Sequence, residues 1–280
     1  MRVKAAVIQM NFSRETEQNV EKGAQLIKKA AGEGAEIIAL PELATNIYFA
    51  FEMDRKYFKL AEPIPGPSTE RICAAAKEAN AYVLFPLYER VQDGELYNTV
   101  VFIGRGGNVI GKYRKTSIPL TKLKEITGFE KYYFRPGNLG FPVWQTDLGF
   151  KVGTVICFDR HFPEGPRCLG LAGCDIMFVP AATPAGGSFW EIELQAHAVA
   201  NCMWVAGVNR VGKDVGGGPA KFYGRSFFAS PRGEIKARLG GGKDAILHCA
   251  VDTSISAEMR EEWGFFRDRR PDAYSALVAL

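Results

Sequence analysis

Three residues with reactive side chains each follow a run that is typical of a buried β-strand. They are Glu42 after residues 37–41, Lys115 after residues 109–114, and Cys157 after residues 152–156. In α/β proteins, functional side chains gather beyond the carboxyl ends of strands, where the chain leaves the core. The pattern therefore predicts that the three strand ends meet at one site.

A thiol, an ammonium group and a carboxylate together can carry out nucleophilic catalysis. A free cysteine thiol has a pKa of about 8.5, so it is mostly protonated at neutral pH. A nearby ammonium such as Lys115 favours the thiolate, and a carboxylate such as Glu42 can accept the proton. The ammonium can then stabilise a negative tetrahedral intermediate. Taken singly, Cys157 also fits a packing role and the two charged residues fit a solvated surface, so spacing alone leaves both interpretations open.

Alternating apolar patterns predict the elements that would hold these residues. Helical spacing predicts helices over residues 16–32, 69–79, 163–172, 189–202 and 254–263. Strand-like runs cover residues 3–9, 36–40, 82–88, 99–103, 109–113, 151–156, 175–180, 203–208, 226–229 and 245–251. Residues 116–148 form a long irregular stretch, and a loop of that length in a compact domain is usually functional. The alternation of strands and helices favours an α/β sandwich.

Composition excludes several classes of protein. The 280 residues are 47% hydrophobic and carry a net charge of +4, which is too small to indicate nucleic acid or a membrane surface as partner. No apolar stretch approaches the length of a membrane span, and no glycine-rich phosphate loop follows a strand. The six cysteines form no CxxC pair, which argues against structural zinc and favours a cytoplasmic protein with reduced thiols. We expect one domain over residues 1–280 with a C-terminal tail.

Three segments together resemble the nitrilase superfamily of carbon–nitrogen hydrolases. They are Leu-Pro-Glu-Leu at residues 40–43, Gly-Lys-Tyr-Arg-Lys at 111–115, and Ile-Cys-Phe-Asp at 156–159 followed by Phe-Pro-Glu at 162–164. The order of Glu, Lys and Cys also matches, and the resemblance covers nearly the whole chain. It implies a four-layer αββα sandwich, no metal or other cofactor, a small-molecule substrate, and a homo-oligomer that is a dimer or larger.

The resemblance also implies a role for each residue. Glu42 would be the general base, Lys115 the oxyanion-stabilising cation and Cys157 the nucleophile. The backbone N–H of Phe158 would be the second oxyanion donor. A second carboxylate often lies between the Lys and the Cys in this family. Glu130 is our candidate for it, and Glu125 is the competing choice.

The substrate is indicated by residues that follow the nucleophile. Branches of the family that act on N-carbamoyl amino acids carry an arginine at the position of Arg160, where it pairs with the substrate carboxylate. A structural ion pair with Asp159 or Glu164 is the alternative. Thr183 resembles a threonine near the substrate carboxylate in N-carbamoyl-D-amino acid hydrolases, and it also fits the first turn of a helix.

Other segments resemble β-ureidopropionase, with two departures from the carbamoylase branches. The segments are residues 137–146, Trp190 with Glu193, residues 209–212 and residues 267–272. Ser117 stands where both carbamoylase branches usually have histidine. His161 stands where the D-amino acid branch has a second arginine. These departures put the substrate in doubt but leave the mechanism unchanged.

The sequence therefore predicts hydrolysis of an N-carbamoyl amino acid, α or β, to amino acid, ammonia and carbon dioxide through a covalent cysteine intermediate. Other branches of the same superfamily remain as alternatives, namely an amidase, an ω-amidase or an N-carbamoylputrescine hydrolase. A non-catalytic binding protein with the same fold is the alternative of a different class. Such a protein would be expected to lack at least one of Glu42, Lys115 and Cys157, and all three are present.

Overall fold

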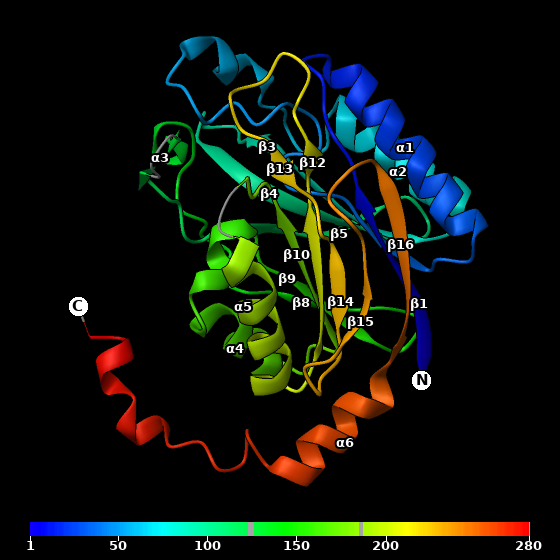
Figure 1. Ribbon diagram of the computed structural model, residues 1–280, viewed down its shortest axis with the longest axis vertical. Coiled ribbons are helices and arrows are strands. Elements are labelled where there is room, and N and C mark those ends of the chain that lie inside the picture. Colours follow the sequence, from blue (N-terminus) through cyan, green and yellow to red (C-terminus); the bar gives the residue numbers. More distant parts are fainter. Residues whose placement is uncertain (123–125, 185–186, 280) are drawn as a thin grey trace.

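The computed structural model describes residues 1–122, 126–184 and 187–279, and its centre is a pair of six-stranded sheets (Figure 1). The first sheet has the order β16 (Ala245–Asp252), β1 (Arg2–Gln9), β2 (Ile37–Ala39), β3 (Tyr82–Arg90), β4 (Leu96–Ile103) and β5 (Val109–Arg114). The second has the order β15 (Ile235–Arg238), β14 (Phe227–Ala229), β11 (Trp204–Asn209), β10 (Ile176–Ala181), β9 (Lys151–Thr154) and β8 (Val143–Gln145).

The described residues also form two further pairs of short strands and six α-helices. The short pairs are β6 (Thr121–Lys122) with β7 (Thr127–Gly128), and β12 (Val211–Gly212) with β13 (Phe222–Tyr223). The helices are α1 (Thr16–Gly32), α2 (Pro67–Ala79), α3 (Glu130–Tyr133), α4 (Glu164–Leu171), α5 (Gly187–Ala200) and α6 (Thr253–Trp263). No helix of the described residues is long and apolar enough to cross a membrane.

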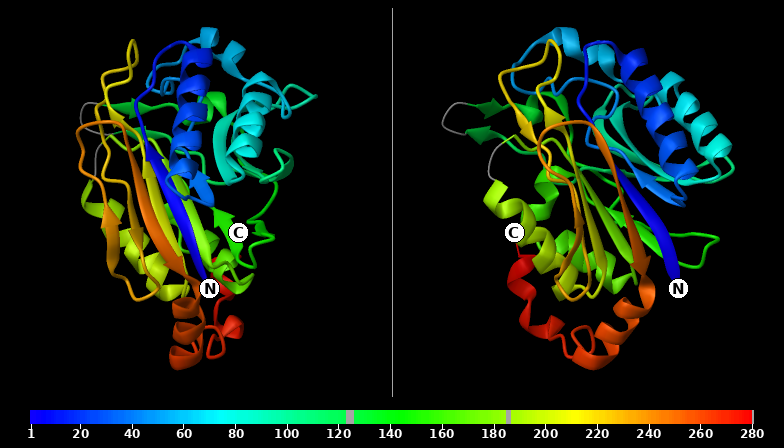
Figure 2. Two further views of the ribbon diagram at one scale, coloured as in Figure 1. Left: turned by 90° about the vertical axis from the view of Figure 1, so that its right-hand side faces the viewer. Right: turned by 45° about the vertical axis from the view of Figure 1, so that its right-hand side comes forward.

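Burial alternates along the strands and divides the core into three layers. In β1, Val7 packs between the sheets with Phe178 and Ala206 of the second sheet, while its neighbour Ile8 packs with Val20 and other residues of α1 and α2. Successive strand residues point to opposite faces, which is why a single strand contributes to both cores. On the far side, a third core joins α4 and α5 to the second sheet. The predicted four-layer αββα sandwich is confirmed (Figures 1 and 2).

Some element boundaries differ from the sequence prediction, at a proline, at the turn of Cys157 and in short strands. The helix predicted from residue 69 begins at Pro67, because proline suits the first turn of a helix. The strand predicted to reach residue 156 ends at Thr154, before the chain turns sharply at Cys157. The irregular stretch 116–148 contains the edge strand β8 and the helix α3, and β15 was not predicted either. Both strands have at most four residues, too few for a clear periodic signal.

The carboxyl ends of β2 and β9 place residues from the two sheets opposite each other. In the first sheet, β2 lies parallel to β1 and β3, and in the second β9 lies parallel to β10. The chain that leaves β2 at residue 40 and the chain that leaves β9 at residue 155 both enter the same end of the sandwich. The end of β5 joins them there through its pairing with β4.

Candidate active site

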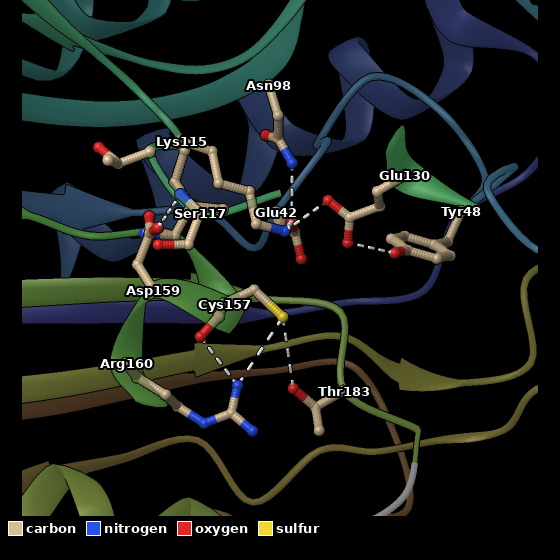
Figure 3. Close-up of polar contacts among 12 residues, drawn as sticks. Glu42, Tyr48, Asn98, Lys115, Ser117, Glu130, Cys157, Asp159, Arg160 and Thr183 are labelled. Atoms are coloured by element: carbon tan, nitrogen blue, oxygen red, sulfur yellow. Dashed lines mark hydrogen bonds and ion pairs between the residues drawn. The ribbon is translucent and has the colours of Figure 1, made fainter. Parts of the chain in front are cut away.

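The structure brings Glu42, Lys115 and Cys157 together with Glu130, from four separate segments of the chain (Figure 3). Lys115 lies between the two carboxylates of the cluster. Its Nζ lies 2.8 Å from Glu42 Oε1 and 2.6 Å from Glu130 Oε2. All three charged residues are buried. Burial lowers the pKa of Lys115, but the two carboxylates outweigh it and the pKa is raised, so the ammonium remains charged and can stabilise an oxyanion.

One oxygen of Glu42 is held in place and the other has no partner. Oε1 accepts hydrogen bonds from Lys115 Nζ at 2.8 Å and from Asn98 Nδ2 at 2.7 Å. Oε2 is buried without a hydrogen-bond partner among the residues that the structure describes. An unsatisfied buried carboxylate oxygen is energetically unfavourable and is common where a group has a catalytic role. Oε2 is therefore suited to accept a proton from the nucleophile.

Glu130 begins the short helix α3 and forms the second carboxylate of the cluster. Its Oε1 accepts a hydrogen bond from the Tyr48 hydroxyl at 2.6 Å, and its Oε2 faces Lys115. Burial raises the pKa of Glu130 to about 6, and the nearby Lys115 charge opposes that rise. The structure thus places Glu130 where the sequence prediction required a second carboxylate, whereas the competing Glu125 lies outside the described residues.

Cys157 lies in a strained turn directly after the end of β9. Its φ angle is +46°, in the left-handed region that is unfavourable for residues other than glycine. Asp159 stabilises the turn, because its Oδ2 accepts the backbone N–H of Ile156 at 3.0 Å and the Tyr113 hydroxyl at 2.7 Å. Phe158 follows in the same turn, with its ring 5.1 Å from that of His161.

The thiol of Cys157 is more basic than the sequence argument implied. Burial and the charge of Glu42 raise its pKa to about 11, although Lys115 and Arg160 act in the opposite direction. The expected preference for the thiolate beside an ammonium is therefore outweighed. Because the resting thiol is protonated at neutral pH, attack on a substrate requires a base such as Glu42 to take the proton at the same time.

Arg160 and Thr183 lie on the other side of the sulfur. Arg160 Nη1 donates to the Cys157 carbonyl oxygen at 2.9 Å and lies 3.9 Å from Sγ. Its ion-pair partner is Glu193, 3.1 Å from Nε, and neither Asp159 nor Glu164, the two structural partners considered from sequence. Thr183 Oγ1 is 3.7 Å from Sγ.

Several contributors to the site were not predicted. Asn98 orients Glu42, Tyr48 orients Glu130, and Asn209 holds the backbone of Thr183, whose N–H it accepts at 2.9 Å. Asn98 directly precedes the predicted strand of residues 99–103, and an asparagine next to an apolar run was a signal that could have indicated it. Tyr48 has no such signal. Among residues 1–122, 126–184 and 187–279, no group of three or more His, Cys, Asp or Glu side chains could hold a metal ion.

The chain is similar to known proteins along almost its whole length. The sequence model of the family described as carbon-nitrogen hydrolase matches residues 4–261. The chain is 34% identical to an N-carbamoylputrescine amidase of Solanum lycopersicum, over 99% of this chain and 95% of that protein. It is also 34% identical to a beta-ureidopropionase of Arabidopsis thaliana, over 96% of this chain and 69% of that protein. A solved carbon-nitrogen hydrolase from Helicobacter pylori G27 has a TM-score of 0.91 and 29% identity, covering 100% of this chain and 99% of its own.

Proposed function

Because this chain belongs to the carbon–nitrogen hydrolase family of the nitrilase superfamily, we propose that it hydrolyses N-carbamoyl amino acids with the nitrogen on the α or β carbon. The products are the free amino acid, ammonia and carbon dioxide. The observation that carries the proposal is the position of Arg160, whose guanidinium Nη1 lies 3.9 Å from the Cys157 sulfur. That cation can bind a carboxylate close to the reacting carbon.

The distance from Arg160 to the sulfur favours a short substrate. During attack the carbamoyl carbon lies next to Sγ, so a carboxylate one or two carbons beyond the carbamoyl nitrogen reaches the guanidinium. A carboxylate at the far end of a longer chain reaches it only if the chain folds back. No described residue accepts a hydrogen bond from Arg160 Nη2, which leaves that nitrogen to donate to a substrate.

The residues of the cluster would act in two half-reactions. Glu42 takes the thiol proton as Cys157 attacks the carbamoyl carbon, and Lys115 with the Phe158 N–H stabilises the oxyanion. Collapse of the intermediate breaks the bond to the terminal nitrogen, which leaves as ammonia with the proton from Glu42. The N-substituted thiocarbamate on Cys157 is then hydrolysed by a water that Glu42 deprotonates. The released carbamic acid decays to carbon dioxide and the amino acid.

A second candidate substrate carries an amine in place of the carboxylate. The relative from Solanum lycopersicum is named as an N-carbamoylputrescine amidase. In this chain, the carboxylate of Glu193 lies beside Arg160, and 24% of the Glu193 side chain is exposed. An ammonium-ended substrate would pair with Glu193 and be repelled by Arg160. An ω-amidase substrate also carries a carboxylate, so Arg160 would serve it as well, but with an amide in place of the carbamoyl group.

The experiment that separates these candidates is ammonia release from a substrate panel. The panel contains N-carbamoyl-β-alanine, N-carbamoyl-D- and L-amino acids, N-carbamoylputrescine, an ω-amide of a dicarboxylic acid and an uncharged aliphatic amide. Cys157→Ala is the control for chemistry at the thiol. Turnover of the short carboxylate-bearing carbamoyl compounds by the unmodified enzyme alone supports the proposal. Preference for N-carbamoylputrescine or the uncharged amide contradicts the role given to Arg160 and leaves the cysteine mechanism standing.

A further inference from the structure

The segment that follows β2 is irregular in conformation yet completely buried. Residues 41–50 form no helix or strand, and each of them is buried. Buried backbone groups outside regular structure need other hydrogen-bond partners, because an unpaired buried carbonyl is destabilising. This segment carries Glu42 at one end and Tyr48 near the other. A side chain that donates hydrogen bonds to carbonyl groups of this segment therefore also helps to fix two residues of the site.

The guanidinium of Arg210 satisfies three of these carbonyl groups, those of Glu42, Leu43 and Asn46. Arg210 follows the last residue of β11 in the second sheet and is fully buried. Its Nε and Nη2 donate to the Glu42 carbonyl oxygen at 3.0 and 2.9 Å. Nη2 also donates to the carbonyl oxygens of Leu43 and Asn46, each at 2.7 Å. Leu43 has a φ angle of +51°, so the guanidinium holds a strained turn directly after the catalytic carboxylate.

Asp214 extends the same contact to the second carboxylate of the site. Its Oδ2 lies 2.7 Å from Arg210 Nη1 and also accepts the backbone N–H of Tyr48 at 2.7 Å. The Tyr48 hydroxyl in turn donates to Glu130 at 2.6 Å. One buried ion pair is thus connected to Glu42 through its backbone and to Glu130 through Tyr48.

We propose that Arg210, together with Asp214, is a positioning residue that holds Glu42 and Glu130 in their catalytic geometry from the opposite sheet. The inference rests on carbon–nitrogen hydrolysis by Cys157 and not on the identity of the substrate. Arginine is required because its planar guanidinium group donates to several oxygens at fixed angles, whereas the ammonium group of lysine cannot reproduce that geometry. The rings of Phe12 and Phe222 cover the guanidinium, at 4.0 and 5.6 Å from their centroids, and exclude water.

The first test is Arg210→Lys, which keeps a positive charge but replaces the planar guanidinium with an ammonium group. With the best substrate of the panel, kcat should fall by about tenfold to a hundredfold, because small displacements of catalytic groups have effects of that size. KM should change little, since Arg160 and Thr183 are untouched. Arg260→Lys is the matched control, because Arg260 Nη2 also donates to a backbone carbonyl, that of Cys174 at 2.7 Å, far from the site. A raised KM with unchanged kcat, or an equal kcat loss in the control, overturns the proposal.

The second test needs no substrate turnover, so it separates this inference from the proposed function. The rate of Cys157 alkylation by iodoacetamide at about pH 9 is measured by peptide mass spectrometry, where the thiolate is the reactive form. Glu42→Gln and Arg210→Lys should each accelerate labelling, because each removes or displaces the Glu42 charge that raises the thiol pKa. The double variant should label as fast as Glu42→Gln alone. Independent, multiplying effects would show that Arg210 does not act through Glu42.

Asp214→Asn keeps the proposal testable should the lysine variant fail to fold. The asparagine oxygen still accepts the Tyr48 N–H, while the charge opposite Arg210 is lost. We expect a kcat loss in the same direction, and no added effect on labelling in the Glu42→Gln background. Unchanged kcat in a folded Asp214→Asn enzyme overturns the proposal.

Discussion

The side chain of Asp159 accepts the backbone N–H of Ser117 at 2.7 Å, so the turn that carries Cys157 is bonded directly to the segment that follows Lys115. The nucleophile belongs to the second sheet and the lysine to the first. A single carboxylate, which is 2% exposed, therefore bonds these two segments to each other. Burial raises the pKa of Asp159, although Lys115 and three hydrogen bonds oppose that rise.

Asp159→Asn should loosen this connection. The amide group turns one acceptor into a donor, which then faces an N–H or O–H group that needs an acceptor. We expect a loss of about 1–3 kcal/mol in the free energy of unfolding and a kcat reduced by about tenfold or more. Thermal denaturation and steady-state kinetics measure the two effects. Asp147→Asn is the control, since Asp147 accepts the Tyr82 hydroxyl at 2.7 Å away from the site. Wild-type kcat in a folded Asp159→Asn enzyme would show that this bond does not position the nucleophile.

Glu42→Gln should abolish turnover and yet make the thiol easier to alkylate. The pKa of Cys157 is about 11, raised by burial and by the Glu42 charge. Removing that charge lowers the pKa, and the thiolate fraction at a fixed pH below it increases. The measurement is the iodoacetamide labelling rate against pH, with the exposed Cys168 as the internal standard. A labelling midpoint that stays in place or moves to higher pH contradicts the assigned charge interaction.

Glu130 should control the acid side of the pH–rate profile. Its pKa is raised to about 6, so the carboxylate is neutralised as the pH falls through that value and its attraction for Lys115 is lost. We expect kcat/KM to decline below about pH 6 in the unmodified enzyme. Glu130→Gln should be less active at neutral pH and should lack this decline, because the group that titrates is gone. Persistence of the same acid limb in the variant assigns it to another residue.

Gly137→Ala should damage the site through the backbone of β5. A Cβ at this position would lie 2.1 Å from the Arg114 carbonyl oxygen and 2.9 Å from that of Lys115. The Gly137 N–H also donates to the Lys115 carbonyl oxygen at 2.8 Å, so the backbone of Lys115 must move. Overpacking of this kind costs about 1–3 kcal/mol, and kcat should fall with it. Gly32→Ala is the control, because no atom lies within 4 Å of its Cβ. A stability and kcat equal to the control would contradict the predicted clash.

Arg160→Lys should change which substrate is preferred. The kcat/KM ratio between an N-carbamoyl amino acid and an uncharged amide is informative, because damage to the Cys157 turn affects both substrates alike. We expect this ratio to fall by about tenfold or more as the contact between the guanidinium and the substrate carboxylate is lost. An unchanged ratio means that Arg160 supports the turn through the Cys157 carbonyl and does not bind substrate.

The class of fold and the positions of Glu42, Lys115 and Cys157 near strand ends could be predicted from the amino-acid sequence. Apolar periodicity reports which side of each local element is buried, and the three polar residues stand where that pattern stops. The segments around them carry the resemblance to the family. The strands β8 and β15 were not predicted, because three or four residues are too few to show a periodic pattern of burial.

How these residues act on one another could not be predicted from local patterns, because it depends on the folded arrangement of the chain. The placement of Glu130 against Lys115, the pairing of Arg160 with Glu193 and the contact between Arg210 and Glu42 all join segments far apart in the chain. The pKa of the Cys157 thiol could not be predicted either, since it depends on burial and on charged residues from other segments of the chain. Local patterns carry no information about such distances, because they are set by how separate elements of the chain pack against one another.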